Sequence, residues 1–411
     1  MNILYIHQYF ITPNDPGGTR SYWLAREFVK KGHNVTMLTS SSKFEEKIKQ
    51  VKIDGIDVIY IKVEYSQNMS FYRRLLAFTF FILKSTRVSL KLKNIDLVLA
   101  TSTPLSIGIP ALIKKIFHKT PYVFEVRDVW PEAVIAIGAV KNNFFKFILY
   151  KLESIIYLNS SAITPLSSGM KDSIINRFDN LNIPIITIPN ISDIEKFNTN
   201  QDLNQKKYLK KIIGFHPDFS ILYAGTFGQV NGISYVIELA EKIFKINENL
   251  IFILIGSGSL KKEVIEKAKE KGVLNKNLFI LDSIPKADLP SLYSEISMGS
   301  SFVIPVKELW NNSANKFFDT LAAGKPVLIN YGGWQKKIIE DNDIGYVLPI
   351  SLDETSIEKF NNYTKNKLKL DSQGENALKI ATELYSLDVA VNKYLSLFDQ
   401  ISHIYKQRII N

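Results

Sequence analysis

Cysteine is absent from this 411-residue sequence. The chain therefore has no disulfide, no thiolate zinc site and no cysteine nucleophile, and the absence is typical of a reducing cytoplasm. Histidine is scarce as well, with five residues and no paired spacing, so no metal site is predicted. Neither GxGxxG nor GxxxxGK[ST] occurs, which disfavours a dehydrogenase or a phosphate-loop enzyme.

Long hydrophobic runs are also missing. The longest nearly uncharged apolar segment, "LLAFTFFIL" at residues 75–83, is far shorter than the ~20 residues that a membrane-spanning helix needs. The first residues, "MNILYIHQYF", have neither a basic leader nor a cleavage site. They predict a strand rather than a signal peptide, and a cytoplasmic protein.

The composition is that of a globular protein, with 46% hydrophobic and 22% charged residues. Because 411 residues exceed what one hydrophobic core usually holds, two domains are expected. The net charge of +11 is consistent with nucleic acid, an anionic membrane or an anionic small molecule as partner. No zinc finger, basic zipper or Arg-rich tail favours nucleic acid.

Short apolar runs alternate with helical patterns in two series, which predicts an α/β protein with parallel sheets covered on both faces. The first series of expected strands covers residues 2–9, 34–40, 57–63, 96–102, 122–128, 162–167 and 185–190. The second covers residues 220–227, 250–258, 278–283, 301–306 and 326–331.

These two series predict two doubly wound, Rossmann-like domains facing each other across a cleft. The polar segment 189–219 separates the series and marks the boundary. The predicted domains are residues 1–190 and 191–386, and a C-terminal helix at 387–411 is expected to pack back on the first domain. Ligands of such sheets bind outside the carboxyl ends of the strands.

The loop after the first expected strand contains Gly17 and Gly18, directly before a helix that starts near Thr19. Such a loop allows a ligand to approach the backbone N–H groups, and a plain tight turn is an equally good interpretation. Arg20 is expected either to reach an anion or to be solvated.

"FEVRDVWPE" places several charges at the end of an apolar strand. Alternation puts Glu125 and Arg127 on one face, and charges at such a position are costly unless they meet a ligand or each other. A ligand-facing role is favoured over a structural Arg–carboxylate pair. Asp128, before the Trp130-Pro131 turn, is the candidate cleft-facing carboxylate.

Two glycine-rich loops follow strands of the second series. Gly225, Gly228 and Gly232 precede a helix start, which predicts an anion site, although such loops can also be structural. Gly256 and Gly258 form a second loop of this type that is expected to approach a base or a ribose.

"SANKFFDTLAAGKPVLIN" predicts a helix start, a turn and a strand. Lys316 and Asp319 lie one helical turn apart on one face, next to Asn315. A cation at a helix start opposes the helix dipole unless an anion binds there, so a diphosphate beside Lys316 and a ribose diol on Asp319 would fit. A surface ion pair is the alternative, and spacing alone does not decide.

Two basic, aromatic helical patterns suggest a membrane surface. Residues 70–93 combine apolar side chains with Arg73, Arg74, Lys84 and Arg87, and residues 141–157 are similar. A buried crossover helix is the alternative, and it is at least as good an interpretation for the second segment.

Taken in order, these segments resemble glycosyltransferase family 4 over nearly the whole chain. "GTRSYWLAREFVKKGHNV" is similar to the first loop and helix of the family, and "IPNISDIEKF" to its "IPNGVD…F" segment, with Ile191 in place of Gly. "NKFFDTLAAGKPV" resembles "KxxExxAxGxPV", with Asp319 at the second Glu of the EX7E motif. "RDVWPE" and the 312–326 stretch look most similar to bacterial N-acetylfucosaminyl (L-fucosamine) transferases of O-antigen and capsule synthesis.

The sequence departs from the family at charged positions. Thr226 and Asn231 stand where an Arg and a Lys that bind diphosphate are usual, and Asn311 stands at the first Glu of EX7E, with Glu308 as a possible substitute. The resemblance therefore implies that diphosphate binding relies on Lys316, the N–H groups of the glycine loops and Arg20 or Arg127. It also implies a different grip on the sugar, which suits a deoxy or N-acetyl sugar.

The resemblance implies the GT-B fold and a retaining, hexosyltransferase-type enzyme that uses a nucleotide-diphosphate sugar, UDP-linked by expectation. The second domain would bind the donor and the first the acceptor, a polyprenyl-diphosphate-linked O-antigen or capsule glycan at the inner face of the cytoplasmic membrane. Neither a metal nor a cofactor is implied. The predicted catalytic residues are Asp128, Arg127 and Lys316; the predicted donor-binding residues are Gly17, Gly18, Gly225, Thr226, Gly228, Asn231, Gly256, Asn315, Lys316 and Asp319. A sugar-nucleotide 2-epimerase and a non-catalytic nucleotide-sugar-binding scaffold are the alternatives.

Overall fold

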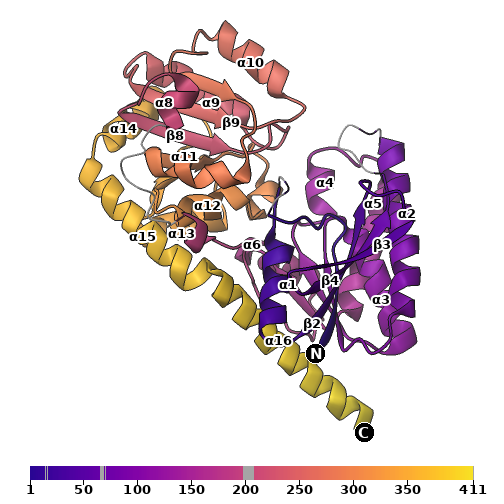
Figure 1. Ribbon diagram of the computed structural model, residues 1–411. Coiled ribbons are helices and arrows are strands. Elements are labelled where there is room, and N and C mark those ends of the chain that lie inside the picture. The colour runs from indigo at the N-terminus through magenta and orange to yellow at the C-terminus, as the bar shows by residue number, and fades with distance from the viewer. Residues whose placement is uncertain (14, 16, 65–68, 70, 198–207, 411) are drawn as a thin grey trace. The chain divides into compact units, whose positions relative to one another are not determined.

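A computed structural model describes residues 1–13, 15, 17–64, 69, 71–197 and 208–410 (Figure 1). Parts of four predicted segments lie outside these residues: Asn14 and Pro16 of the first loop, Ser70 of the first basic helix, residues 198–207 of the interdomain segment and Asn411 of the C-terminal helix. The chain divides into two compact units, and each is described by itself. Unit 1 is Met1–Pro189 with Leu387–Asn411, and unit 2 is Asn190–Ser386.

Unit 1 is built on a seven-stranded sheet with the order β3-β4-β2-β1-β5-β6-β7. The strands are β1 Asn2–Ile6, β2 Asn34–Ser41, β3 Ile48–Ile53, β4 Ile56–Lys62, β5 Leu97–Thr101, β6 Tyr122–Val126 and β7 Ala162–Pro165. Their pairings are parallel except for the β3–β4 hairpin, which is antiparallel. The inner strands β1, β5 and β6 are almost wholly buried, because helices cover both faces of a parallel sheet.

The helices of unit 1 connect these strands or follow the last of them. They are α1 Arg20–Lys30, α2 Phe71–Lys91, α3 Gly108–His118, α4 Glu132–Ala136, α5 Asn143–Asn159, α6 Ser168–Arg177 and the C-terminal α16 Leu387–Ile410, with a 3-10 turn η1 at Leu105–Ile107. The chain's last helix belongs to unit 1 because its aromatic residues pack on α1. Phe28 contacts Tyr394 and Phe398, with ring centroids 5.9 and 5.4 Å apart.

Unit 2 contains a six-stranded sheet with the order β10-β9-β8-β11-β12-β13 and parallel pairings. The strands are β8 Phe219–Ala224, β9 Leu250–Ile255, β10 Leu278–Leu281, β11 Met298–Ser301, β12 Val327–Ile329 and β13 Gly345–Val347. The helices are α7 Ile194–Phe197, α8 Tyr208–Ile213, α9 Ile233–Phe244, α10 Lys261–Glu270, α11 Leu289–Glu295, α12 Asn315–Ala322, α13 Trp334–Asn342, α14 Glu354–Thr364 and α15 Lys367–Tyr385, with 3-10 turns η3 Lys286–Asp288 and η4 Lys307–Asn311.

Local sequence explains the main elements of unit 2. All six residues of β9, "LIFILI", are buried, as in a strand covered on both faces. In α9 the buried residues Ile233, Val236, Ile237 and Ala240 recur at helical spacing and pack on the sheet. Asp353 and Ser356 form a capping box that fixes the start of α14.

Two expected strands are wrong. Residues 185–190 make only a bridge to β7, through hydrogen bonds from Ile186 and Ile188, because Pro184 and Pro189 lack the N–H groups of a ladder. Residues 301–306 lie mostly beyond β11, which begins earlier, at Met298. The edge strands β3 and β13 are not in the prediction. Within the described residues, no helix has both the length and the apolarity to cross a bilayer.

Candidate functional site

Lys316 lies in the first turn of α12, at the edge of the unit 2 sheet where the strands end. Its ammonium nitrogen is 4.8 Å from the centre of the Tyr223 ring. A Cβ placed on Gly225 would stand 2.9 Å from Lys316 Cε. The lysine therefore lies across the beginning of the loop that follows β8, and the structure brings together Lys316 and the Gly225 loop.

The charge of Lys316 has little compensation. Burial lowers its pKa to about 8, against the opposing influence of Asp319. The start of α12 has no side-chain cap and no acidic residue in its first turn. A cation there opposes the helix dipole, and an anion would be attracted by both the ammonium and the helix N-terminus. Asn315, at the first position of the helix, is exposed.

Asp319 faces different surroundings from Lys316. Burial raises its pKa to about 6, although Lys286 and Lys196 lower it more strongly than Lys316 does. These two lysines come from η3 and α7, and Lys196 donates a hydrogen bond to the carbonyl of Lys286 at 2.9 Å. Lys316 thus lies beside the Gly225 loop, whereas Asp319 lies nearer Lys286 and Lys196. The ribose-binding role of Asp319 stays a prediction.

The glycine loops after β8 and β9 pack backbone against backbone. Gly225 N–H donates to Ile255 O at 2.9 Å, Phe227 N–H donates to the carbonyl of residue 257 at 2.8 Å, and Gly256 N–H donates to the carbonyl of residue 281 at 3.2 Å. A Cβ on Gly256 would collide with the Gly225 carbonyl, and one on Gly258 with the backbone of Phe227. Glycine is therefore required here by the protein's own backbone. The packing of the backbone is thus a sufficient reason for these glycines, and the approach of a base or a ribose to this loop stays a prediction.

Polar side chains hold the Gly225 loop through hydrogen bonds. One of them is Asn231, at a position where family members usually have a lysine. Tyr223 OH and Asn231 Nδ2 each donate to the Thr226 carbonyl at 2.8 Å. Gly228 accepts a hydrogen bond from the Asn231 N–H group at 3.1 Å. Gly232 has a φ of 55° and lies against the backbone of Val303, just before α9. Asn231 thus holds the loop in shape and adds no positive charge.

The segment before α12 contains polar atoms that lack hydrogen-bond partners. In the described part of the chain these buried atoms include Trp310 Nε1, Asn312 Oδ1 and Ser313 Oγ. Asn190 Nδ2 donates to the Ser313 carbonyl at 2.7 Å, while its own Oδ1 has no partner. Buried polar atoms without hydrogen-bond partners destabilise a fold. A polar ligand that paired with these atoms would therefore bind favourably at this segment. Glu308, the possible substitute for the first Glu, is exposed in η4.

In unit 1, Glu125 is the centre of a buried charge network. Arg20 Nε lies 2.8 Å and Tyr394 OH 2.7 Å from its Oε1, and Thr101 Oγ1 donates to its Oε2. Although burial alone would raise it, the charges of Arg20 and Arg127 and the two hydroxyl donors lower the pKa of Glu125 to about 2. Arg20 also donates to the carbonyls of residues 188 and 189. Arg20 is thus neither solvated nor free for an anion, and Glu125 forms a structural pair with Arg20 rather than with Arg127.

The two predicted catalytic residues of unit 1 lie beside this network. Asp128 is half-buried and accepts a hydrogen bond from Thr103 Oγ1 at 2.6 Å. The Arg127 guanidinium is 3.4 Å from His7 Nε2, and His7 Nδ1 is 2.8 Å from Ser21 Oγ. Burial lowers the pKa of His7 to about 3, so the imidazole is neutral. His7 is absent from the predicted site, although its place at the end of β1 was a usable signal.

Gly17 and Gly18 precede α1 at the same edge of the unit 1 sheet. Gly17 is exposed, with a φ of 130°, and a Cβ there would stand 2.7 Å from Ile11 Cδ1. The position suits the predicted approach of a ligand to the backbone, and this role stays a prediction. No group of three or more histidine or acidic residues that could hold a metal occurs among the described residues.

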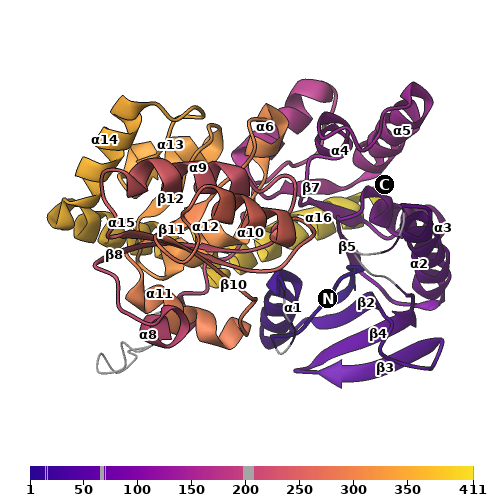
Figure 2. The same ribbon diagram turned by 90° about the horizontal axis from the view of Figure 1, so that it is seen from above.

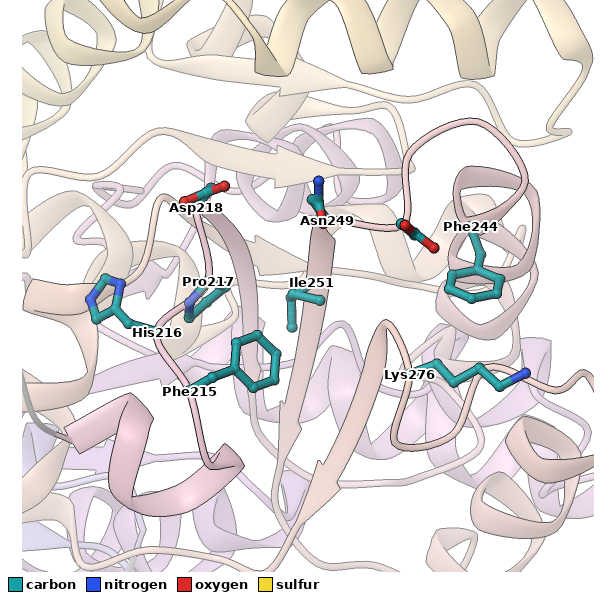
Figure 3. Close-up of a pocket in the computed structure, with 9 residues that line it drawn as sticks. Phe215, His216, Pro217, Asp218, Phe244, Asn249, Ile251 and Lys276 are labelled. Atoms are coloured by element: carbon teal, nitrogen blue, oxygen red, sulfur yellow. The ribbon is translucent and has the colours of Figure 1, made fainter.

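A separate pocket opens at the other edge of the unit 2 sheet, beside the first residues of β8 and β9. Its volume is about 390 Å³, and Figure 3 shows Phe215 and Phe244 on either side of Ile251. The remaining lining residues are His216, Pro217, Asp218, Glu248, Asn249 and Lys276. Because Lys316 and the glycine loops follow the carboxyl ends of the strands, this pocket is not the predicted donor site.

Comparison with curated proteins finds distant relatives. The chain is 19% identical to spore coat protein SA of Bacillus subtilis (strain 168) over 294 residues, which are 69% of this chain and 77% of that protein. It is 29% identical to the putative colanic acid biosynthesis glycosyl transferase WcaI of Escherichia coli (strain K12) over 123 residues, 30% of this chain and 28% of that one.

Solved structures of similar fold cover almost the whole chain. Sucrose-phosphate synthase from Thermosynechococcus elongatus superposes with a TM-score of 0.75 at 13% identity, over 97% of this chain and 98% of that one. Anabaena Alr3699/HepE in complex with UDP and glucose superposes with a TM-score of 0.70 at 14% identity, over 97% and 100%. At such identities the likeness shows the fold.

Two family models match the chain, one on each side of the boundary between the units. The model described as Glycosyltransferase Family 4 matches residues 17–196. The model described as Glycosyl transferases group 1 matches residues 205–380. The chain therefore carries the family 4 and group 1 domains of a glycosyltransferase and has the GT-B fold.

Proposed function

We propose that this glycosyltransferase transfers a sugar, with retention, from a UDP-linked donor to a lipid-linked precursor of a surface polysaccharide. The observation that carries the proposal is the half-buried Lys316 ammonium at the uncapped start of α12, against the Gly225 loop. Support for UDP comes from the HepE structures, which hold UDP, UDP with glucose, or UDP-glucose. Support for the acceptor comes from the relative described as a colanic acid glycosyl transferase and from the similar structure of WaaG, described as involved in lipopolysaccharide biosynthesis.

In the proposed mechanism Lys316 and the α12 N-terminus hold the diphosphate. As the bond between the sugar and the diphosphate breaks, negative charge grows on the leaving oxygen, and a fixed ammonium in a half-buried place stabilises that charge. Asp319 accepts hydrogen bonds from the ribose diol. Asp128, held by Thr103 at 2.6 Å, orients the acceptor hydroxyl or the donor sugar, and the proposed role of Arg127 is to help bind the diphosphate. The acceptor hydroxyl attacks from the face that the diphosphate leaves and gives its proton to the departing phosphate oxygen, so the anomeric configuration is kept.

The proposed donor sugar is a deoxy or N-acetyl sugar, with N-acetylfucosamine as the candidate. Its support is the uncharged side chains of the segment before α12, where Asn311, Asn312 and Ser313 stand near the usual place of the first Glu. Amide and hydroxyl groups suit a neutral N-acetyl group, because they both donate and accept hydrogen bonds. The proposed place of action is the inner face of the cytoplasmic membrane.

A binding screen with UDP-, TDP- and GDP-sugars tests the donor, followed by turnover with a polyprenyl-diphosphate-linked sugar. The expected result is tightest binding of a UDP-sugar and a lipid-linked product, whose anomeric configuration is read by NMR and matches that of the donor. A free epimer without acceptor would replace the proposal by a 2-epimerase. Binding without any turnover would replace it by a scaffold, and an inverted product would overturn retention.

A further inference from the structure

Three helices of unit 1 expose apolar side chains along one side of that unit. Helix α3 packs against both α2 and α5, and Figure 2 shows the three helices side by side. The exposed apolar residues are Leu75, Leu76, Phe80 and Leu83 of α2, Ile116 and Phe117 of α3, and Phe144, Phe145, Phe147, Ile148, Tyr150, Ile155 and Leu158 of α5. So many large apolar side chains on neighbouring helices indicate an interaction surface.

The beginning of α5 stands out within this surface. Phe144, Phe145 and Phe147 are 67%, 58% and 59% exposed, and Ile148 is 43% exposed. At about 100° per residue they cover roughly half of the helix circumference. The helix start is well formed, because the Asn142 side chain accepts a hydrogen bond from Phe144 N–H. Residues 142–148 are called the α5 wedge below.

The charges on this surface have one sign. Helices α2 and α3 contain no acidic residue, and α5 contains only Glu153. The Glu153 side chain is fully buried and accepts hydrogen bonds from Arg177 at 2.6 and 2.9 Å. Basic residues alternate with the aromatic ones: Lys84 Nζ lies 5.8 Å from the Phe80 ring and Lys151 Nζ lies 5.7 Å from the Phe147 ring, measured to the centroids.

We propose that this surface docks on an anionic lipid bilayer, with the α5 wedge inserted and α2 lying along the interface. Cations beside exposed aromatic and aliphatic residues, without exposed carboxylates, suit anionic headgroups above an apolar layer. A second copy of the chain is a poorer occupant, since two cationic faces would repel each other.

The docking surface deepens the proposed function and rests on it for one point, that the acceptor is carried by a lipid. The surface lies on helices that carry none of the predicted catalytic or donor-binding residues. Docking and donor binding are therefore separable, and each can fail without the other.

Flotation or sedimentation with vesicles tests the proposal on the full chain. We expect binding to phosphatidylcholine vesicles with about 30% phosphatidylglycerol, a probe composition, and much weaker binding to phosphatidylcholine alone. The double variant Phe144→Ser/Phe147→Ser should lower the partition coefficient about 30-fold or more. Lys146→Gln/Lys151→Gln should lower only the part of vesicle binding that depends on anionic lipid and on salt concentration.

The matched control is Leu368→Ser/Phe215→Ser, which removes two exposed apolar side chains from unit 2, 85% and 40% exposed. It should bind vesicles as the unchanged chain does. The variant Phe144→Trp should shift its added emission to the blue on vesicles, whereas Leu368→Trp should not. Equal vesicle binding by the wedge variant and the control would overturn the proposal, as would a dimer that the wedge variant abolishes.

A parallel titration with UDP separates this proposal from the proposed function. Wedge variants should bind UDP as the unchanged chain does and keep its melting temperature, because the replaced side chains are exposed. If no UDP-sugar binds in the donor screen while vesicle binding depends on the wedge, the docking surface is supported and the donor assignment is contradicted. If a UDP-sugar binds while vesicle binding does not depend on the wedge, the donor assignment is supported and the docking surface is contradicted.

Discussion

Glu125 in unit 1 and Asp319 in unit 2 are both carboxylates in shielded surroundings, yet their pKa values move in opposite directions. That of Glu125 falls to about 2, and that of Asp319 rises to about 6. Glu125 has Arg20 at 2.8 Å and two hydroxyl donors, so its charge is compensated within the fold. Asp319 is desolvated without a comparable set of donors. A compensated buried charge is typical of structure, whereas an undercompensated one is typical of a ligand site.

Breaking the compensated pair should have the largest effect. Arg20→Met leaves Glu125 buried and unpaired, so the free energy of unfolding should fall by about 3–5 kcal/mol. Arg26→Met in the same helix is the control, because the pair of Arg26 with Glu27 is partly exposed and should contribute about 1 kcal/mol or less. Denaturant unfolding measures both.

The pH dependence sharpens this test. Since the folded pKa of Glu125 is lower than its ordinary value, its ionisation stabilises the fold above pH 4.5, and this contribution is lost as pH falls toward 2. The stability difference between the unchanged chain and Glu125→Gln should shrink over that window. A constant difference would contradict the compensated-charge interpretation.

Removing the undercompensated cation should change binding instead of stability. Lys316→Met deletes a charge-assisted contact with diphosphate, so the affinity for UDP should fall about 10- to 100-fold while the melting temperature stays the same or rises. Lys336→Met removes an exposed lysine of α13 and should change neither. Isothermal titration and thermal unfolding measure the two effects, and an unchanged UDP affinity would remove Lys316 from the donor site.

The low pKa of Lys316 predicts a pH profile. Below about pH 8 the ammonium is charged, so UDP binding should be nearly constant from about pH 7 to that point; above it the affinity should fall by up to about tenfold per pH unit. Lys316→Arg keeps its charge at every pH used, so its profile should be flat. The same slope in both proteins would assign the titration to another group.

Asp319→Asn should give the smallest change in stability and affinity of these variants, and its pattern separates a ligand-binding role from a structural one. Because the folded pKa of about 6 exceeds the ordinary value of 3.8, ionised Asp319 destabilises the fold at neutral pH. The amide should therefore raise the melting temperature by about 2–4 °C per kcal/mol recovered, and this gain should vanish toward about pH 4. UDP should bind more weakly and pyrophosphate equally well. Parallel losses of stability and of affinity for both ligands would indicate a structural role.

The two series of strands and helices were predictable because hydrophobic periodicity is local. The strand at 185–190 fails for a local reason, the flanking prolines, whereas β13 is three residues long and too short for a periodic signal. In the candidate site, Lys316 and Asp319 share one helical face by spacing alone. The packing of Gly256 and Gly258 could not be predicted, because the sequence does not show that the carbonyls of Gly225 and Phe227 lie against them.

The sequence by itself determined the alternation of elements, the amphipathic α12 and the family resemblance, because each depends on residues close in the chain. Only the tertiary structure decided which arginine neutralises Glu125 and that the first turns of α5 stay exposed. Arg20 is 105 positions and Tyr394 is 269 positions from Glu125. Residues so distant in the sequence become partners only through the packing of the sheet and helices. The same packing determines whether a buried charge is compensated by the protein or is left for a ligand to compensate.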